Sequence, residues 1–175
     1  MKLQGRPWWF ALGVVALILA GWWWFGWLTS AERQIDKQLD RIQELLAKSP
    51  GEDNLGALAK ARAAAELFAD SFEFEAEQFD FHTRDRQQLI SGIHQYRSRA
   101  QVILVQYPEK DLSVDPDLAR ATSHVTVQFV TKARDLAGRE AYRFQINWLE
   151  QDGKWRMDYV RLLEVIEEPP SAWIP

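Results

Sequence analysis

The stretch from 146 to 165, INWLEQDGKWRMDYVRLLEV, leaves the chain few choices of fold, because it encodes two strands and the turn that joins them. Asp152-Gly153 is typical of two-residue hairpin turns, in which both central residues need a positive φ. A turn at this dipeptide fixes the pairing of the strands and sets Ile146 opposite Tyr159. The hairpin then gathers large apolar side chains on one face, namely Phe144, Ile146, Trp148, Trp155, Met157 and Tyr159.

Three helices are predicted upstream of this hairpin. The first follows a capping box formed by Thr29 and Glu32, the second runs from about 53 to 70, and the third covers 84–98. Their apolar residues recur at intervals of three and four, as in helices that bury one face. The spacing in the first helix also suits a short coiled coil.

Strands are predicted where apolar and polar residues alternate. Alternation over 71–82 predicts one or two short strands, and alternation over 120–132 and 139–150 predicts two long ones. The apolar run 100–107 predicts a further strand, which Pro108 is expected to close, with a loop after it. Each long strand has one apolar and one polar face, which is typical of antiparallel sheets.

Three segments carry a resemblance to a known superfamily: ELFADSFEF, TRDRQQLISGI and WLEQDGKWRMDYVRLLEV. Over roughly 30–166 the chain resembles the nuclear transport factor 2 superfamily, which includes SnoaL-like and ketosteroid-isomerase-like domains. These segments mark a fold and are not a catalytic motif. The resemblance implies an α+β fold, a cone-shaped domain of three helices packed on a strongly curved antiparallel sheet, with a pocket at its wide end.

The N-terminal part of the chain predicts a transmembrane helix. The 21 residues from Trp8 to Leu28 carry no charge, and a helix of that length spans roughly 31 Å, which matches a hydrocarbon core of about 30 Å. A cleavable signal peptide is the alternative, but the long apolar stretch and the poor cleavage site disfavour it. Tryptophans gather at both ends of the stretch, where indole rings prefer the membrane interface: Trp8, Trp9, Trp22, Trp23, Trp24 and Trp27.

These features divide the chain into four parts. Residues 1–6 are a short cytoplasmic head, 7–28 the transmembrane helix, 29–168 the nuclear transport factor 2-like domain and 169–175 a C-terminal tail. A short basic head before one apolar helix resembles a bacterial signal anchor. We therefore expect a single-pass protein of the bacterial inner membrane with its C-terminal domain in the periplasm.

The composition restricts the partners of the chain. A net charge of -4 and a pI near 5.4 give no basic surface for nucleic acid. The absence of cysteine excludes disulfides and thiolate chemistry. The expected partners are membrane lipid, a protein and a second copy of the chain in a homodimer. Trp173 and Ile174, which follow two prolines in the tail, are candidates for binding the protein partner.

The apolar face of the last strands is expected to line the cone. Two interpretations remain open at this point, because the same large side chains could line a cavity or fill it as a dense core. The candidates for a ligand pocket are Phe129, Tyr142, Phe144, Ile146, Trp148, Trp155, Met157 and Tyr159.

No catalytic residue, metal ligand or cofactor is assigned. The enzymes that this fold resembles use a carboxylate base with Tyr or protonated Asp donors inside the cone, and here Tyr142 and Tyr159 have no evident carboxylate partner. The three histidines, His82, His94 and His124, lack the spacing of metal ligands. The leading prediction is a non-catalytic binding or assembly domain for a protein or a small apolar ligand. The alternative is an enzyme for a small hydrophobic substrate.

Overall fold

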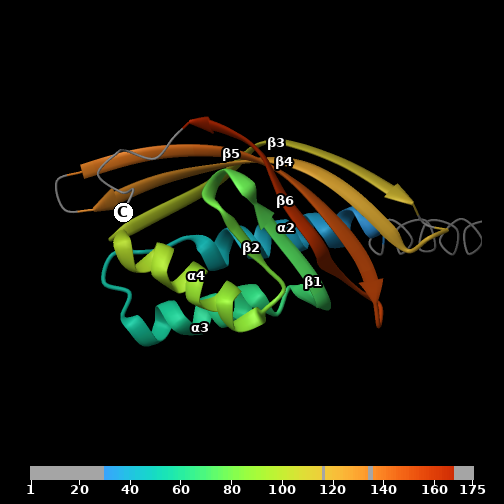
Figure 1. Cartoon of the computed structure of the whole chain (residues 1–175), viewed down its shortest axis with the longest axis horizontal. Helices are drawn as coiled ribbons and strands as arrows, with labels where there is room; N and C mark the ends of the chain where they lie inside the picture. Colours follow the sequence, from blue (N-terminus) through green and yellow to red (C-terminus); the bar gives the residue numbers. More distant parts are fainter. Residues whose placement is uncertain (1–29, 116, 134–135, 168–175) are drawn as a thin grey trace, which may run out of the picture.

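The predicted C-terminal hairpin forms the middle of a six-stranded sheet with the order β2-β1-β6-β5-β4-β3. The computed structural model describes residues 30–115, 117–133 and 136–167. Figure 1 shows the sheet as a curved layer with the helices on one of its faces. The helices are α2 (Ala31–Leu46), α3 (Asn54–Ala65), the short 3-10 helix η1 (Glu77–Phe79) and α4 (Arg86–Arg99). The strands are β1 (Phe68–Ala76), β2 (Phe81–Thr83), β3 (Val102–Asp115), β4 (Arg120–Ala133), β5 (Leu136–Gln151) and β6 (Lys154–Glu167).

The turn between β5 and β6 has the predicted geometry, but the register changes further along the hairpin. Both turn residues have positive φ, 54° at Asp152 and 71° at Gly153, as two-residue hairpins require. Trp148 pairs with Met157 as expected. Beyond that pair β6 contains one extra residue, so Ile146 faces Val160 and not Tyr159. The bulge moves Tyr159 to the opposite face of the sheet from the other predicted residues.

The sheet is mixed, whereas the sequence predicted an antiparallel one. Strand β1 runs parallel to β6, with Phe74 opposite Val160. The hairpin turns that force antiparallel pairing join only strands that follow one another closely in the chain. Strand β1 is separated from β6 by α4 and four strands, so its direction in the sheet is set by packing. The remaining neighbours pair antiparallel.

Two predicted boundaries were wrong. Helix α3 ends at Ala65 and not near 70, because Phe68 and Ala69 are buried in β1. Strand β3 does not end at Pro108 but continues to Asp115, with a shift of register between Gln106 and Glu109 around the proline. Proline is tolerated there because β3 lies at the edge of the sheet and the irregularity removes the need for its missing N–H.

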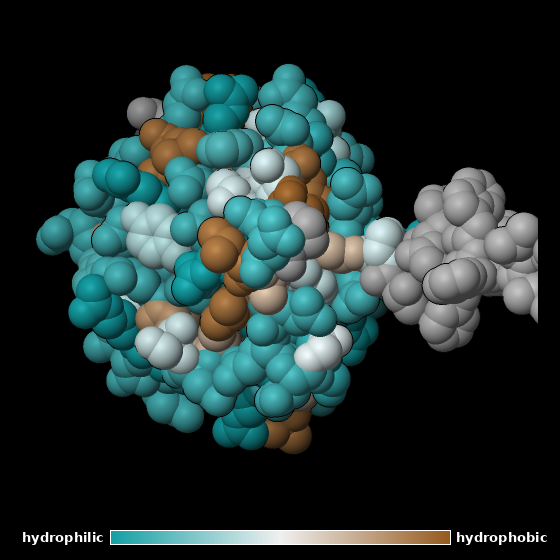
Figure 2. Space-filling model, turned by 90° about the vertical axis from the view of Figure 1, so that its right-hand side faces the viewer, coloured by the Kyte–Doolittle hydropathy of each residue, from teal (hydrophilic) through white to brown (hydrophobic). Residues whose placement is uncertain are grey.

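The helices bury their apolar faces against one face of the sheet. Helix α2 contributes Ile35 and Leu39, which are almost fully buried. Helix α3 is capped by Asp53, whose side chain accepts a hydrogen bond from the Gly56 amide at 2.8 Å, and α4 is capped in the same way by Asp85. Figure 2, which views one end of the molecule, shows a largely hydrophilic surface with apolar residues gathered near its middle.

A buried arginine joins α4 to the end of α2. Arg97 has no exposed surface, and its guanidinium donates to the carbonyls of Leu45, Leu46 and Ala47. These are among the carbonyls that the end of a helix leaves without a partner. The same guanidinium forms an ion pair with Glu52, so its charge is compensated inside the domain.

The predicted transmembrane helix at 7–28 and the membrane-interface tryptophans lie outside the described residues. Within the described part of the chain, no helix is both long enough and apolar enough to cross a membrane.

Candidate functional site

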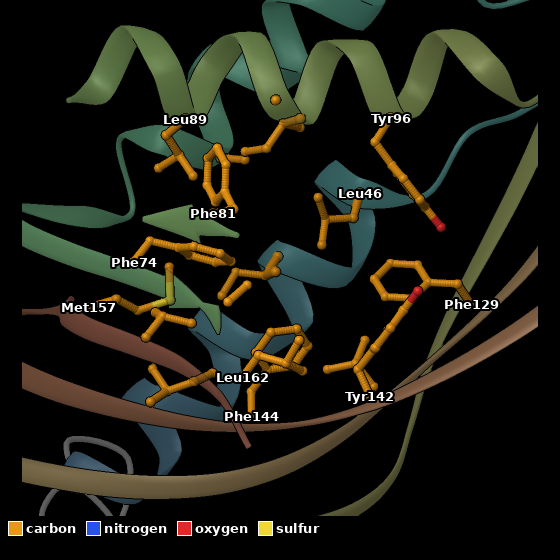
Figure 3. Close-up of a pocket in the computed structure, with 18 of the residues that line it drawn as sticks. Leu46, Phe74, Phe81, Leu89, Tyr96, Phe129, Tyr142, Phe144, Met157 and Leu162 are labelled. Carbon is orange, nitrogen blue, oxygen red and sulfur yellow. The ribbon is translucent and has the colours of Figure 1, made fainter. Parts of the chain in front are cut away.

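The space between the inner face of the sheet and helices α2 and α4 holds a cavity of about 570 Å³. Its wall is mainly apolar and comes from both helices, from α3 and η1, and from all six strands. Strand β2 contributes Phe81 alone and β3 contributes Tyr107 alone. Figure 3 shows Phe74, Phe81 and Met157 at one end of this space and Tyr96, Phe129 and Tyr142 at the other. Of the two interpretations that the sequence left open, a cavity or a dense core, the structure has the cavity.

Five of the eight predicted pocket residues line the cavity, namely Phe129, Tyr142, Phe144, Ile146 and Met157. They come from three adjacent strands, β4, β5 and β6, whose inner faces meet under α4. Alternation along each strand places these side chains on one side of the sheet. Whether they bind a ligand stays a prediction.

The other three predicted residues lie elsewhere. Trp148 and Trp155 are buried in the core without lining the cavity, and the Trp148 indole N–H donates to Ser123 Oγ at 2.9 Å. Tyr159 lies on the outer face, where its hydroxyl donates to Glu75 Oε2 at 2.5 Å. The bulge in β6 explains this difference, since it turns Tyr159 away from the side on which Met157 lies.

A buried carboxyl group that the sequence interpretation missed contacts two tyrosines of the cavity wall at one end. Glu140 is 1% exposed, and its Oε2 accepts hydrogen bonds from the Tyr142 hydroxyl at 2.8 Å and from the Tyr96 hydroxyl at 3.4 Å. Tyr96 comes from α4 and Tyr142 from β5, and Figure 3 shows their hydroxyl groups directed toward one another. Glu140 Oε1 is buried and has no hydrogen-bond partner among the described residues.

Burial dominates the ionisation of this group. It raises the pKa of the Glu140 carboxyl above its ordinary value, although the two hydrogen bonds from the tyrosines act in the opposite direction. Burial and the nearby Glu140 carboxyl also raise the pKa of the Tyr96 hydroxyl, so this tyrosine is neutral. A carboxyl with a raised pKa holds its proton at a higher pH than an exposed glutamate does.

A sequence signal for this pair was present. Glu140 and Tyr142 are two residues apart on a strand that alternates, so they share a face. The expectation that Tyr142 has no carboxylate partner on its own face was therefore wrong. Tyr159 also has such a partner, Glu75, but that pair lies on the outer face. The contribution of Tyr96 could not be found in the same way, because it depends on how α4 packs over the sheet.

A second cluster lies on the outer face of the sheet, where Glu73, Glu75 and His82 bring possible metal-ligand atoms within 4.8 Å of one another. Each carboxylate already has partners. Glu73 accepts from His82 Nε2 and from Arg84, both at 2.7 Å, and these bonds lower the pKa of its carboxyl. Two hydrogen-bonded carboxylates beside an arginine have little free capacity for a cation.

The predicted partner-binding residues Trp173 and Ile174 lie outside the described residues.

No family model matches the sequence, and no curated protein matches it. Solved structures do match. An NTF2-like protein with a cystatin-like fold from Novosphingobium aromaticivorans is 14% identical with a TM-score of 0.58, and the match covers 75% of this chain and 79% of that one. A protein of unknown function with a cystatin-like fold from Nostoc punctiforme is 15% identical with a TM-score of 0.57, covering 78% of this chain and 92% of that one.

An enzyme is also among the similar structures. The hexachlorocyclohexane dehydrochlorinase of Novosphingobium barchaimii is 9% identical with a TM-score of 0.60, and the match covers 83% of this chain and 94% of that one. At such identities the likeness concerns the fold alone, and one fold serves many functions. The described domain has the NTF2-like, cystatin-like fold that the sequence resemblance implied.

Proposed function

We propose that this domain binds a small, largely apolar molecule in the cavity between the sheet and α4. The observation that supports the proposal most directly is the cavity itself, about 570 Å³ with a mainly apolar wall. Pockets for small organic ligands have volumes of roughly 300–1,000 Å³ and combine apolar walls with a few polar groups. Here the polar groups are gathered at one end, around Tyr96 and Tyr142.

The test fills the cavity from the side of the helix. Gly92 lies in α4 and lines the cavity, and a Cβ at this position would meet only the Phe81 ring, at 3.9 Å. Gly92→Leu therefore places a side chain in the cavity, and leucine favours the helix more than glycine does. Ser91→Leu is the matched control, because Ser91 is exposed on the same helix.

The measurement is a fluorescence titration with naphthalene on the full-length chain in mild detergent, with a micelle blank. The wild-type protein and Ser91→Leu are expected to bind naphthalene with equal affinity, whereas Gly92→Leu loses saturable binding. Equal titration curves for Gly92→Leu and the wild-type protein would show that naphthalene does not enter this cavity. Failure of all three proteins to bind would reject the proposal.

An acid–base enzyme is a second candidate function, and Glu140 is the observation that favours it. A buried carboxyl with a raised pKa lies one hydrogen bond from a residue of the cavity wall, Tyr142. Such a group can take a proton from a carbon next to a carbonyl and return it. NMR of 2-tetralone in D₂O would detect this as exchange of the α-hydrogens. The wild-type protein should accelerate exchange over a protein-free sample and Glu140→Gln should not.

The position of the domain at a membrane is also a proposal, and it is supported by the uncharged stretch from Trp8 to Leu28 alone. The chain contains no cysteine, so a single introduced cysteine reports its own location. Ser71→Cys, at an exposed position of β1, should react with a membrane-impermeant maleimide in intact spheroplasts if the domain is periplasmic. Labelling only after lysis would place the domain in the cytoplasm.

A protein partner and a homodimer remain proposals that the sequence suggested. The outer face of the sheet is the surface left open by the helices, and it carries charged residues such as Arg143 and Glu164. Co-purification of the full-length chain in mild detergent, followed by mass spectrometry and light scattering, distinguishes a reproducible partner and a dimer from a monomer.

A further inference from the structure

The exposed residues of the cavity wall mark its opening. Of the described residues that line the cavity, three are exposed to solvent, namely Phe79, Gln95 and Arg99. Gln95 and Arg99 are four residues apart in α4, so they lie on the same side of the helix. Phe79 belongs to η1, and its ring contacts the ring of Tyr142 at 6.0 Å between centroids. The cavity therefore opens between η1 and the C-terminal half of α4.

This opening lies at the end of the cavity where its tyrosines meet. Gln95 directly precedes Tyr96 in α4, and the Tyr96 ring is 5.5 Å from the Phe129 ring between centroids. Figure 3 shows Tyr96, Phe129 and Tyr142 together at this end. A polar group of a ligand can stay in contact with water in the opening, so it does not need a hydrogen-bond partner in the protein.

The opposite end of the cavity is apolar. Figure 3 shows Phe74, Phe81 and Met157 there, which come from the neighbouring strands β1, β2 and β6. The Phe74 and Phe81 rings meet edge to face at 5.7 Å between centroids, and Met157 is 3% exposed. Tyr107, the third tyrosine of the wall, lies on β3 at the far edge of the sheet. A polar group at the apolar end would lose its water without gaining a hydrogen bond from the side chains around it.

We infer that the ligand of this cavity is an amphipathic molecule with one polar end, which lies in the opening between η1 and α4 while the apolar end lies against Phe74, Phe81 and Met157. This inference rests on the proposed function, since it names the class and the orientation of the ligand that the cavity binds. A molecule that is polar at both ends is disfavoured, because one of its polar groups would be buried without a partner. The orientation does not depend on the ionisation of Glu140, which is buried and does not line the cavity.

The test compares two isomers on the full-length protein in mild detergent. Naphthalene-2,3-diol carries both hydroxyl groups at one end of its long axis, whereas naphthalene-2,6-diol carries one at each end. Burial of a hydroxyl group without a partner lowers the affinity by at least about fivefold. The wild-type protein should therefore bind the 2,3-isomer at least about fivefold more tightly than the 2,6-isomer, in fluorescence titrations corrected for partition into the micelles. A detergent molecule that competes for the cavity lowers both affinities alike and leaves their ratio unchanged.

A matched pair of variants tests the position of the apolar end. Gly92 lines the cavity, and a Cβ at this position would meet only the Phe81 ring, at 3.9 Å. Gly92→Ser adds a hydroxyl group that can accept a hydrogen bond from the second hydroxyl of the 2,6-isomer, so the preference for the 2,3-isomer should shrink. Gly92→Ala adds the Cβ without the hydroxyl and should keep the wild-type preference. The same preference in both variants would reject this position for the apolar end.

A blocking experiment tests the position of the opening. The chain contains no cysteine, so Gln95→Cys can be labelled at that position alone with a bulky hydrophilic maleimide. The unlabelled variant should bind naphthalene like the wild-type protein, and the labelled variant should lose binding. Leu55→Cys is the matched control, because Leu55 is 78% exposed on α3 and does not line the cavity, and its labelled form should bind normally. Unchanged binding by labelled Gln95→Cys would show that the cavity does not open here.

The outcomes separate this inference from the proposed function. If the wild-type protein binds naphthalene but shows no preference for the 2,3-isomer over the 2,6-isomer, the cavity binds ligands and the inference is wrong. If naphthalene and both diols fail to bind, the proposed function fails and the inference fails with it.

Discussion

Strand β5 carries two sets of side chains that alternate along its length and meet opposite surroundings. Tyr142 and Ile146 point to the inner face and are buried against the cavity or the core. Arg143, between them, points to the outer face and pairs with Glu109 and Glu164, each at 3.3 Å. The alternation of apolar and polar residues along the strand thus separates an inner face, which is buried against the core and the cavity, from an outer face, which is exposed to solvent.

The difference between the inner and outer faces of the sheet also determines in which direction the pKa of a carboxyl group shifts. On the inner face, burial raises the pKa of Glu140. On the outer face, hydrogen bonds from His82 and Arg84 lower the pKa of Glu73. Residue type alone therefore does not determine whether a glutamate holds its proton, because the face of the sheet on which it lies decides the balance of burial and charge. Substitutions on the two faces should differ in both size and direction.

The largest effect is expected from Trp148→Ala on the inner face. Trp148 has no exposed surface and donates a hydrogen bond to Ser123, so its loss leaves a void and an unpaired hydroxyl. The free energy of unfolding should fall by about 3–5 kcal/mol, as measured by urea denaturation. Leu104→Ala is the control, because Leu104 is 53% exposed on the edge strand β3. A loss as large in the control would contradict the division between the faces.

The sequence was sufficient for the outline of the fold, because local rules govern it. The Asp152-Gly153 turn and the alternation of β4 and β5 fixed the hairpin and its apolar face. The predictions failed where one residue or one distant strand decided the outcome. A single extra residue in β6 moved Tyr159 to the outer face, and packing beyond the reach of any turn made β1 parallel to its neighbour.

The candidate site was predicted only in part, for a related reason. Its apolar wall follows from alternation, which found five residues of the cavity. Its polar end needs Tyr96 on α4 to meet Glu140 on β5, two residues far apart in the chain that only the tertiary fold brings within 3.4 Å. Arg97 is a similar case, since an arginine in the last turn of a helix gave no sign that it would be fully buried against the end of α2.

A smaller effect with a definite sign is expected from Glu140. Because burial raises its pKa in the folded state above the ordinary value of 4.5, the folded protein binds more protons than the unfolded chain in the range between the two values. Its contribution to the free energy of unfolding is therefore lost as the pH rises from 4.5 through the raised pKa. Urea denaturation across this range should show a flatter pH dependence for Glu140→Gln than for the wild-type protein. Equal slopes would mean that Glu140 is not perturbed.

Glu73 should show the opposite sign on the outer face. Hydrogen bonds from His82 and Arg84 hold its pKa below 4.5, so the unfolded chain binds more protons than the folded protein in the range beneath that value. The stability that Glu73 contributes is present above pH 4.5 and is lost as the pH falls through its lowered pKa. Glu73→Gln should reduce the acid sensitivity of the urea midpoint. If Glu73→Gln and Glu140→Gln shifted the pH dependence in the same direction, the two faces would not differ as proposed.

The smallest effect is expected from Arg143→Ala. Arg143 makes two ion pairs, but its side chain is 42% exposed and both glutamates are more than half exposed. Exposed ion pairs are screened by water and salt and contribute about 0–1 kcal/mol. The free energy of unfolding should thus fall by less than about 1 kcal/mol, and the difference should shrink further in high salt.

A loss comparable to that of Trp148→Ala would show that Arg143 is shielded from water in solution, which is the result expected if the outer face is covered by a second copy of the chain. Repeating the measurement over a range of protein concentrations separates that case, since only a dimer makes the effect depend on concentration.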